Sequence, residues 1–339
     1  MNNHICSRIV ASLLASGMMV SLVSCGENET ADNGTITLTD QAGREVVLDG
    51  PAESVVSCYY VTSYAMLSLG LSDRIVGIEN KADKRAIYGM TDPDLASLTQ
   101  VGSLKECNVE AIAALNPDVV LMPVKLTEHA ETLTSLGIPV LIVDPETQEN
   151  LNGMLTLIGE ACGVSERAEA LIAYYDEKTE TINSYTDGKD IPTVYMGGNS
   201  SYMTTAPSGM YQNGLIELAG GENVGKDLEG DYWTEVSYET ILAMNPDIII
   251  IPSGADYTAE DLCSDSQLAA LDAVKNGEVY SMPSAFEEWD SPVPSGILGA
   301  LWMTSVLHED VYTSTMFTDD VTEFYQTFYG FTPDVSLLN

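Results

Sequence analysis

The chain has 339 residues, 45% of them hydrophobic, and its 51 acidic and 13 basic side chains give a formal net charge of -38 at pH 7. Contacts to phosphate need clustered Lys and Arg, so this balance excludes nucleic acids and anionic lipid surfaces as binding partners. The chain is long enough to bury one large core or two ordinary ones. Its histidines are only His4, His129 and His308, so we expect no metal ion held directly by the protein.

The first 24 residues are a candidate export signal. Arg8 precedes an apolar run, residues 9–23, which has the length of a signal-peptide core and is short for a membrane span. The run ends in Leu22-Val23-Ser24-Cys25, which resembles the lipobox of bacterial lipoproteins, where the signal is removed before an acylated cysteine. We therefore predict a lipoprotein signal peptide over 1–24, lipidation of Cys25 and a flexible tether over 25–35. An ordinary secretory signal that contains a cysteine is the alternative.

From residue 36 onward, short apolar runs rich in Val and Ile alternate with helical patterns. In a first lobe, expected over 36–147, the predicted strands are 54–58, 75–78, 118–122 and 139–143, and the predicted helices are 61–69, 108–115 and 129–136. Glycine or Asn-Pro follows each of these helices and is expected to end it. Strands that alternate with helices in this way form parallel sheets covered on both faces.

Residues 148–186 have apolar side chains at helical spacing and contain no strand candidate. Gly163 is expected to end a first helix, and Ser165 to cap a second, longer one. Alternation resumes in a second lobe over 187–339, with predicted strands 192–196, 247–251 and 279–282 and helices 210–218, 238–244, about 294–307 and one more before the terminus. The predicted fold class is α/β, with two lobes joined by a helical segment.

An internal repeat relates the two lobes. Residues 108–123 read NVEAIAALNPDVVLMP and residues 237–252 read SYETILAMNPDIIIIP, with seven of 16 positions identical. The two stretches share the Asn-Pro-Asp sequence between helix and strand as well as their helix–strand pattern, so we expect the lobes to share an architecture. Glu110 and Glu239 hold the same place in the repeat. A carboxylate near a helix start stabilises the helix dipole, and the alternative role is docking onto a partner with two basic pockets.

Catalytic signatures are absent from the sequence. It contains no G-x-S-x-G, no P-loop, no H-E-x-x-H and no calcium-loop pattern. The Gly-rich stretch 220–225 follows a helix, and we interpret it as a helix end and turn. Cys58, Cys107, Cys162 and Cys263 are widely spaced and are interpreted as buried thiols. We expect no enzyme; a lipid-anchored surface enzyme that uses an interlobe cleft and an adhesion module are the alternatives.

Aromatic side chains follow several of the predicted strands. Ligands bind at the carboxyl ends of strands in open parallel sheets, and aromatic groups with a few polar ones suit a sizeable, partly apolar ligand. We therefore expect a ligand-binding cleft between the lobes, or alternatively simple packing of the lobes against each other. The aromatic candidates for the cleft are Tyr59, Tyr60, Tyr202, Trp233, Phe286 and Trp289.

A set of segments between residues 36 and 307 resembles one family. In the first lobe these are ITLTDQAGREVVLDGPAESVVS (36–57), SLGLSDRIVGI (68–78), NVEAIAALNPDVVL (108–121) and LGIPVLIVD (136–144). In the second they are LIELAGGENV (215–224), WTEVSYETILAMNPDIII (233–250), LAALDAVKNGEVYSMP (268–283) and SPVPSGILGALWM (291–303). Their order and spacing resemble those of the receptors that capture ferric siderophores, haem and cobalamin for ATP-driven importers.

The resemblance implies two lobes bridged by one long helix, with little hinge motion and the ligand held between the lobes. It also implies that Glu110 and Glu239 dock onto arginines of a permease dimer, and that a lipid on Cys25 keeps the receptor, expected to be a monomer, at the outer face of a membrane. No permanently bound cofactor is expected. The implied ligand is an iron chelate, with haem or a corrinoid as alternatives.

The sequence departs from the family in its basic residues. Receptors for anionic siderophores usually line the cleft with Arg, whereas the basic candidates here are Lys105 and Lys125, with Lys84 and Arg85 as further possibilities. Burying a multiply charged catecholate without basic partners is costly. We therefore expect a hydroxamate-type chelate, a corrinoid or haem, and in the last case Tyr59 or Tyr60 is the candidate iron ligand.

Overall fold

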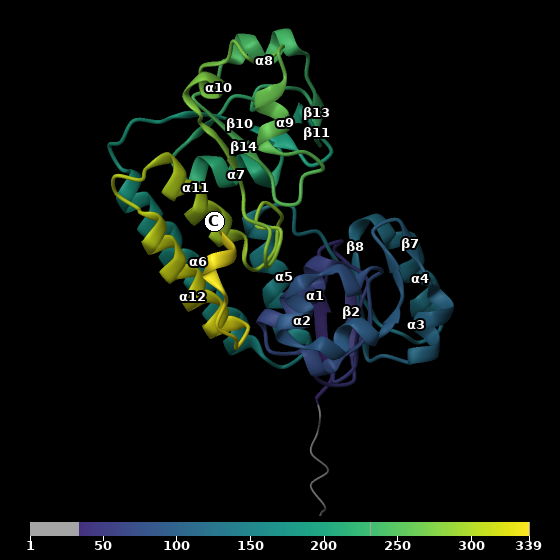
Figure 1. Ribbon diagram of the computed structural model, residues 1–339. Helices are drawn as coiled ribbons and strands as arrows, with labels where there is room; N and C mark the ends of the chain where they lie inside the picture. The colour runs from purple at the N-terminus through teal and green to yellow at the C-terminus, as the bar shows by residue number, and fades with distance from the viewer. Residues whose placement is uncertain (1–33, 231, 339) are drawn as a thin grey trace, which may run out of the picture. The chain divides into compact units, whose positions relative to one another are not determined.

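The computed structural model describes residues 34–230 and 232–338 (Figure 1). The predicted signal peptide, the lipidation site Cys25 and most of the predicted tether lie outside the described residues. A search of the described residues finds no helix that is both long and apolar enough to cross a membrane. Regular structure begins with an antiparallel hairpin of β1 (Ile36–Thr39) and β2 (Glu45–Leu48), which directly follows the predicted tether.

The first lobe contains a five-stranded parallel sheet in the order β5-β4-β3-β8-β9. Its strands are β3 (Val55–Ser57), β4 (Ile75–Ile78), β5 (Thr99–Gln100), β8 (Val119–Pro123) and β9 (Val140–Val143). Its helices are α1 (Tyr60–Ser68), α2 (Ala86–Thr91), α3 (Val109–Leu115) and α4 (Thr127–Ser135), and a small hairpin pairs β6 (Gly102–Ser103) with β7 (Glu106–Cys107). Every strand and helix predicted for this lobe is present, with ends shifted by one or two residues.

Buried side chains cover both faces of this sheet, as parallel pairing predicts. Val56, Val120 and Ile142 pack with the apolar side of α3 and α4. Val55 and Leu121 point to the other face, into the large core shared with α1. Successive strand residues therefore alternate between two cores.

The second lobe is built on a six-stranded sheet. Five strands follow the order β13-β11-β10-β14-β15, and β12 pairs with β10. They are β10 (Thr193–Gly198), β11 (Ser201–Thr205), β12 (Glu222–Asn223), β13 (Thr234–Glu235), β14 (Ile248–Ile251) and β15 (Val279–Ser281). Its helices include α7 (Tyr211–Leu218), α8 (Tyr238–Met244), α9 (Ala259–Ser264), α10 (Asp272–Asn276), α11 (Gly296–Leu307) and α12 (Ser314–Phe328). The predicted strands and helices of this lobe are present.

Three short strands of the second lobe were not predicted. β11 and β13 are antiparallel additions, each too short to show a periodic pattern. The interpretation of 220–225 as a turn is correct only at its start, where Gly220 has a φ of +81° after α7. The next residues form β12, which pairs in parallel with the start of β10.

The segment between the sheets contains two helices: α5 (Gln148–Ala161) contacts α1 and β1 of the first lobe, and the long α6 (Ser165–Thr186) runs from α5 to α7 and α11 of the second lobe. Gly163 separates them with a φ of +69°, as expected. Ser165 is the first helical residue and makes no capping hydrogen bond, because Val164 occupies the cap position. α12 packs beside α6 (Figure 1), where Lys178 Nζ lies 2.6 Å from Asp320 Oδ1. Residues 34–339 form one compact unit, so lobe boundaries at 147 and 187 stay a prediction.

The two sheets share their central order. β4-β3-β8-β9 in the first lobe corresponds to β12-β10-β14-β15 in the second, with parallel pairing throughout. The repeat segments supply α3 with β8 and α8 with β14. Both helices begin at a residue whose side chain accepts a hydrogen bond from the helix, Asn108 and Ser237. The lobes therefore have the shared architecture that the repeat predicts.

Candidate functional site

The carboxyl ends of β3 and β4 and the β6–β7 hairpin surround a hollow of about 420 Å³. Parallel strands end at the same edge of a sheet, which is where α/β proteins bind ligands. The lining residues come from three separate segments of the first lobe. They are Cys58, Tyr59, Tyr60, Glu79, Asn80, Lys81, Arg85, Ser103, Leu104, Lys105 and Glu106.

Tyr59 and Tyr60 enter this hollow at the junction of β3 and α1. Their rings meet edge to face, with centroids 5.0 Å apart. A hydrogen bond at the start of α1 holds this junction in place: the Thr62 hydroxyl donates to the Tyr59 carbonyl at 2.7 Å. Burial raises the pKa of Tyr60 to about 12 and that of Tyr59 further above its usual range. Both phenols are therefore protonated at neutral pH and offer hydroxyl groups and ring faces.

Arg85 joins the two lobes beside Tyr60. Its guanidinium carbon lies 4.1 Å from the centre of the Tyr60 ring, and its Nε donates to Glu79 Oε1 at 3.1 Å. Its Nη1 donates at 3.2 Å to Oε1 of Glu288, a residue of the second lobe. The Tyr64 hydroxyl donates to Glu288 Oε2 at 3.0 Å. The guanidinium is thus neutralised by two carboxylates, one from each lobe.

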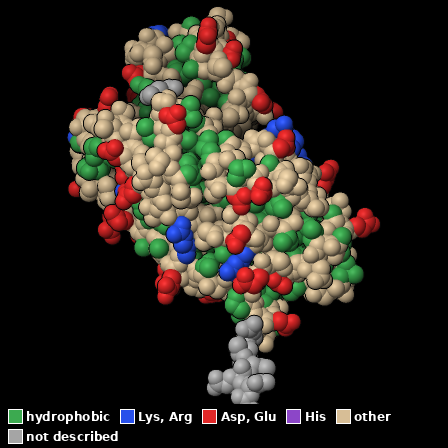
Figure 2. All heavy atoms as spheres, turned by 60° about the horizontal axis from the view of Figure 1, so that its bottom comes forward, with side chains coloured by type: hydrophobic (Ala, Val, Ile, Leu, Met, Phe, Trp, Pro, Cys, Tyr) green, Lys and Arg blue, Asp and Glu red, His purple; other side chains and the backbone are tan. Residues whose placement is uncertain are grey.

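Three lysines of the described chain have no carboxylate oxygen within 4.0 Å, namely Lys81, Lys105 and Lys125. All three lie at the carboxyl edge of the first lobe's sheet. Lys81 and Lys105 line the hollow, and Lys125 follows β8. Lys125 Nζ lies 4.8 Å from the ring centre of Tyr232, a residue of the second lobe. Figure 2 shows more acidic than basic side chains on the visible surface.

The structure brings only part of the predicted site together. Tyr59, Tyr60, Lys105 and Arg85 line the hollow. Lys84 instead points away and pairs with its exposed neighbour Asp83 at 2.7 Å. Lys81 was missed, although its position three residues after a predicted strand was a usable signal.

Trp289 and Phe286 are buried in the second lobe and are not among the residues that line the hollow. Trp289 is 1% exposed, and its Nε1 donates to the Tyr325 hydroxyl of α12 at 3.0 Å. Phe286 is 3% exposed and packs on the same tyrosine, with ring centroids 5.2 Å apart. α12 covers the segment after β15 and turns both rings into the core, which is the packing alternative considered for the aromatic set.

Tyr202 and Trp233 lie outside the lining of the hollow. The Tyr202 hydroxyl donates to Asp265 Oδ2 at 3.0 Å, and the Tyr238 hydroxyl donates to the same oxygen at 2.8 Å. Tyr202 thus belongs to the apolar cluster under α8 and α9. Trp233 is half-buried against the end of β10, where a Cβ on Gly198 would lie 3.2 Å from the indole. The antiparallel strands β11 and β13, which the sequence did not reveal, place both residues there.

Two buried carboxyl groups flank Trp289. Glu287 accepts hydrogen bonds from the Tyr325 and Tyr329 hydroxyls, both at 2.8 Å, and Asp290 accepts one from the Ser253 backbone N–H at 3.2 Å. Burial raises the pKa of each carboxyl group to about 7. A run of acidic residues resembles a solvated loop in sequence, so local composition does not reveal that these two residues are buried.

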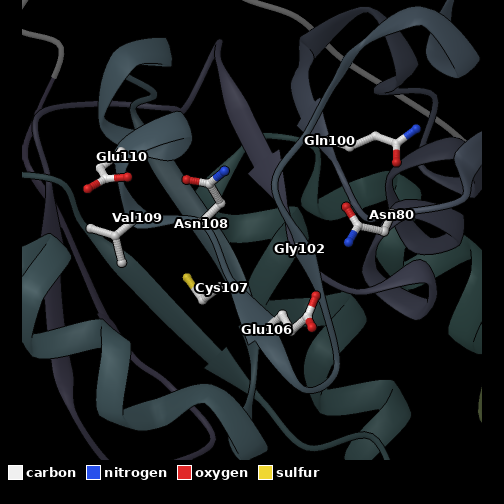
Figure 3. A pocket seen from close by; sticks show the side chains of 8 residues that line it. All are labelled: Asn80, Gln100, Gly102, Glu106, Cys107, Asn108, Val109 and Glu110. Atoms are coloured by element: carbon white, nitrogen blue, oxygen red, sulfur yellow. The ribbon is translucent and has the colours of Figure 1, made fainter.

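Glu110 and Glu239 are exposed, and each is the second residue of its helix, α3 or α8. Glu110 borders a second hollow, of about 500 Å³ (Figure 3). Figure 3 shows Asn80 and Gln100 on one side of this hollow and Glu110 with Asn108 on the other. Asn80 and Glu106 line both hollows, so Glu110 and the hollow at Tyr59 are separated by shared wall residues.

Within residues 34–230 and 232–338, no three His, Cys, Asp or Glu side chains are grouped to hold a metal ion. His129 lies in the first turn of α4 and His308 at the end of α11, as expected. The site offers phenols, ring faces and ammonium groups. Groups of these kinds can make hydrogen bonds, stacking contacts and charge contacts with a small molecule.

Comparison with known proteins places the chain in a family. A family model described as "Periplasmic binding protein" matches residues 55–286. The molybdate-binding protein MolA of Haemophilus influenzae is 25% identical, over 88% of this chain and 92% of MolA. The uncharacterised ABC transporter substrate-binding lipoprotein YvrC of Bacillus subtilis is 24% identical, over 81% of this chain and 88% of YvrC.

A solved structure of a periplasmic solute-binding protein from Veillonella parvula superimposes with a TM-score of 0.80 and 28% sequence identity. The match covers 90% of this chain and 96% of that structure. Proteins of this class are solute-binding proteins that deliver small molecules to an ABC permease. With its α/β fold, its site at the carboxyl strand edge and a family match over most of its length, this chain belongs to the periplasmic binding proteins of the Fe/cobalamin type.

Proposed function

We propose that this protein is the lipid-anchored receptor of an ABC importer and that it captures a metal chelate, a ferric siderophore in first place, at Tyr59 and Tyr60. The observation that carries the proposal is the gathering of Lys81, Lys105 and Lys125 at one sheet edge without carboxylate partners. In a chain of net charge -38, isolated ammonium groups mark where a ligand's negative groups are attracted.

The size of the hollow favours a chelate over a small oxoanion. Its volume of about 420 Å³ comes from the first lobe alone, and small-molecule sites typically measure about 300 to 1,000 Å³. The ring faces of Tyr59 and Tyr60 suit the apolar surface of an organic ligand. Haem, with its two carboxylates, and a corrinoid are the alternatives within the same class.

The lysines change the expected charge of the ligand. From the sequence, the scarcity of arginine favoured a neutral hydroxamate chelate. With three ammonium groups at the edge, a chelate that carries a few peripheral negative groups has partners for them. Arg85 is a weaker candidate, because Glu79 and Glu288 already hold it.

Membrane attachment and delivery complete the proposal. A lipid on Cys25 keeps the receptor at the outer face of a membrane; the relative YvrC is itself described as a lipoprotein. Glu110 and Glu239, one exposed carboxylate from each half of the repeat, dock onto basic pockets of the permease dimer. The receptor acts as a monomer, since each copy supplies both carboxylates.

Isothermal titration calorimetry on the chain from Gly26 onward tests the ligand class. The probes are a ferric trihydroxamate, a ferric tricatecholate, haem, cobalamin and molybdate. We expect saturable 1:1 binding of one chelate, weakened roughly threefold to tenfold by Lys105→Gln, which removes one charge contact. Binding of molybdate alone, or chemical turnover of any probe, would contradict the proposal.

A further inference from the structure

We propose that Glu288 sets the charge preference of the hollow at Tyr59 and Tyr60. It does so by forming an ion pair with Arg85 in the place where a ligand's anionic group would bind. This inference rests on the proposed function, since it concerns how the same site selects its ligand. It makes Glu288, which contributes nothing to the lining of the hollow itself, a specificity-determining residue.

Arg85 is the one arginine among the lining residues of the hollow. Its side chain is 20% exposed and lies against the Tyr60 ring, so a ligand resting on Tyr60 comes within reach of the guanidinium. An arginine in this position is a strong anchor for carboxylates and catecholates, because it donates several hydrogen bonds from one plane. In this protein Nε of Arg85 donates to Glu79, and Nη1 donates to Glu288 and to the Tyr64 hydroxyl.

The two carboxylates that hold Arg85 are not equivalent. Glu79 is buried and also accepts hydrogen bonds from the Tyr88 and Ser63 hydroxyls, both at 2.6 Å. Its place is therefore fixed by the first lobe. The side chain of Glu288 is 39% exposed and reaches Arg85 from the other lobe, with the Tyr64 hydroxyl as its further partner. Glu288 is thus the counter-ion that can be exchanged.

A ligand's negative group gains little at Arg85 while Glu288 is present. It must either displace this carboxylate or sit beside it, and both cost free energy that a neutral ligand does not lose. A ligand in the hollow can therefore pair with the ammonium groups of the lysines, whereas Arg85 is already paired with Glu288. This arrangement favours chelates with few negative charges over multiply charged ones.

Glu288→Gln separates the charge from the shape of this side chain. Glutamine keeps an oxygen for the Tyr64 hydroxyl but no longer neutralises Arg85. The measured quantity is the ratio of two affinities, that for a ferric tricatecholate and that for a ferric trihydroxamate, by calorimetry on the chain from Gly26 onward. We expect this ratio to rise about fivefold in the variant, the effect of one partly exposed charge pair.

Two control variants decide whether the gain comes through Arg85. Glu169→Gln makes the same change of charge at an exposed position on α6 and is expected to leave the ratio unchanged. Glu288→Gln combined with Arg85→Gln is expected to return the ratio to the wild-type value. Circular dichroism melting of each variant verifies that the chain is folded.

The outcomes distinguish this inference from the function on which it rests. If a chelate binds the wild-type chain but Glu288→Gln leaves the ratio within twofold, the inference is wrong and the proposed function stands. A rise that persists in the double variant shows a general charge effect, which also overturns the role of Arg85. If no chelate binds the wild-type chain or the Glu288→Gln variant, both the proposed function and this inference are wrong.

Discussion

Asp118 and Asp247 hold the same position in the two lobes. Each accepts hydrogen bonds from residues at the start of the neighbouring central strand, β3 for Asp118 and β10 for Asp247. Asp118 Oδ2 accepts hydrogen bonds from the backbone N–H groups of Glu53 and Ser54, at 2.9 and 2.8 Å. Asp247 Oδ2 accepts from the N–H and the hydroxyl of Thr193, at 2.8 and 2.6 Å. The equivalence extends the repeat from sequence to hydrogen bonding.

The same repeat fixes the turn before each aspartate. Asn116 and Asn245 end α3 and α8 in the left-handed conformation, with φ of 47° and 37°. Asparagine tolerates this conformation better than most residues, and the proline that follows stops the helix. The shared Asn-Pro-Asp punctuation therefore has a structural reason in both lobes.

We expect Asp118→Ala to lower the free energy of unfolding by about 0.5–1.5 kcal/mol, because it removes the acceptor of two exposed N–H groups just before β3, which water can partly replace. The hydrogen bonds from Glu53 and Ser54 hold the pKa of Asp118 below its usual value. Its contribution is therefore present above the unfolded-state pKa and is lost as the pH falls through the folded-state pKa. Urea unfolding at neutral and acidic pH measures both effects. Asp49→Ala, at an exposed position, is the control and should change little.

Substituting both docking carboxylates should stop transport without affecting capture. Glu110→Ala with Glu239→Ala removes the two exposed charges at the starts of α3 and α8, neither of which lines the hollow at Tyr59. Ligand affinity by calorimetry should stay within about twofold, while uptake by cells that carry the permease is lost. A drop in affinity of more than about tenfold would contradict the docking role.

Stability should fall as the pH rises toward neutrality. Glu287 and Asp290 have pKa values of about 7 in the folded protein, raised by burial. Because the folded state holds these protons more tightly than the unfolded state, deprotonation between about pH 5 and about pH 8 costs on the order of 2 kcal/mol of unfolding free energy for each of the two groups. Denaturant titrations across this range measure the loss.

Glu287→Gln tests which group carries the pH dependence. The amide keeps one acceptor oxygen, for one of the two tyrosine hydroxyls that Glu287 now accepts from, and it does not ionise. The loss of stability toward neutral pH should therefore become smaller. Glu169→Gln on the surface of α6 should keep the wild-type slope. An unchanged slope in Glu287→Gln would assign the effect to other groups.

The four cysteines of the described residues are free thiols, and they should react in a fixed order. Cys263 is exposed, which corrects its interpretation as a buried thiol, and Cys107 is half-buried. Cys58 and Cys162 are buried, and burial raises the pKa of Cys162 to about 11. A thiol reagent should modify Cys263 first in the native protein and reach Cys58 and Cys162 only after denaturant is added. Early modification of Cys58 would indicate that the hollow opens.

Sequence alone determined most of the parallel strands of the two sheets, the longer helices and the order of both. The runs at β8 and β14 are apolar over their whole length because both faces of each strand are covered, and a Gly or an Asn-Pro pair ends the helices close to their observed limits. The repeat located Glu110 and Glu239 at equivalent exposed positions. These are local features, so neighbouring residues suffice to specify them.

Only the tertiary structure decided which side chains form the site. Trp289 and Tyr60 both follow parallel strands, but α12 covers Trp289 and no element covers Tyr60 in the same way. Arg85 looked available for a ligand, yet it is neutralised by Glu288, which lies 203 positions away in the chain. Burial and charge pairing depend on which segments far apart in the sequence come into contact, and a local sequence pattern does not specify these contacts.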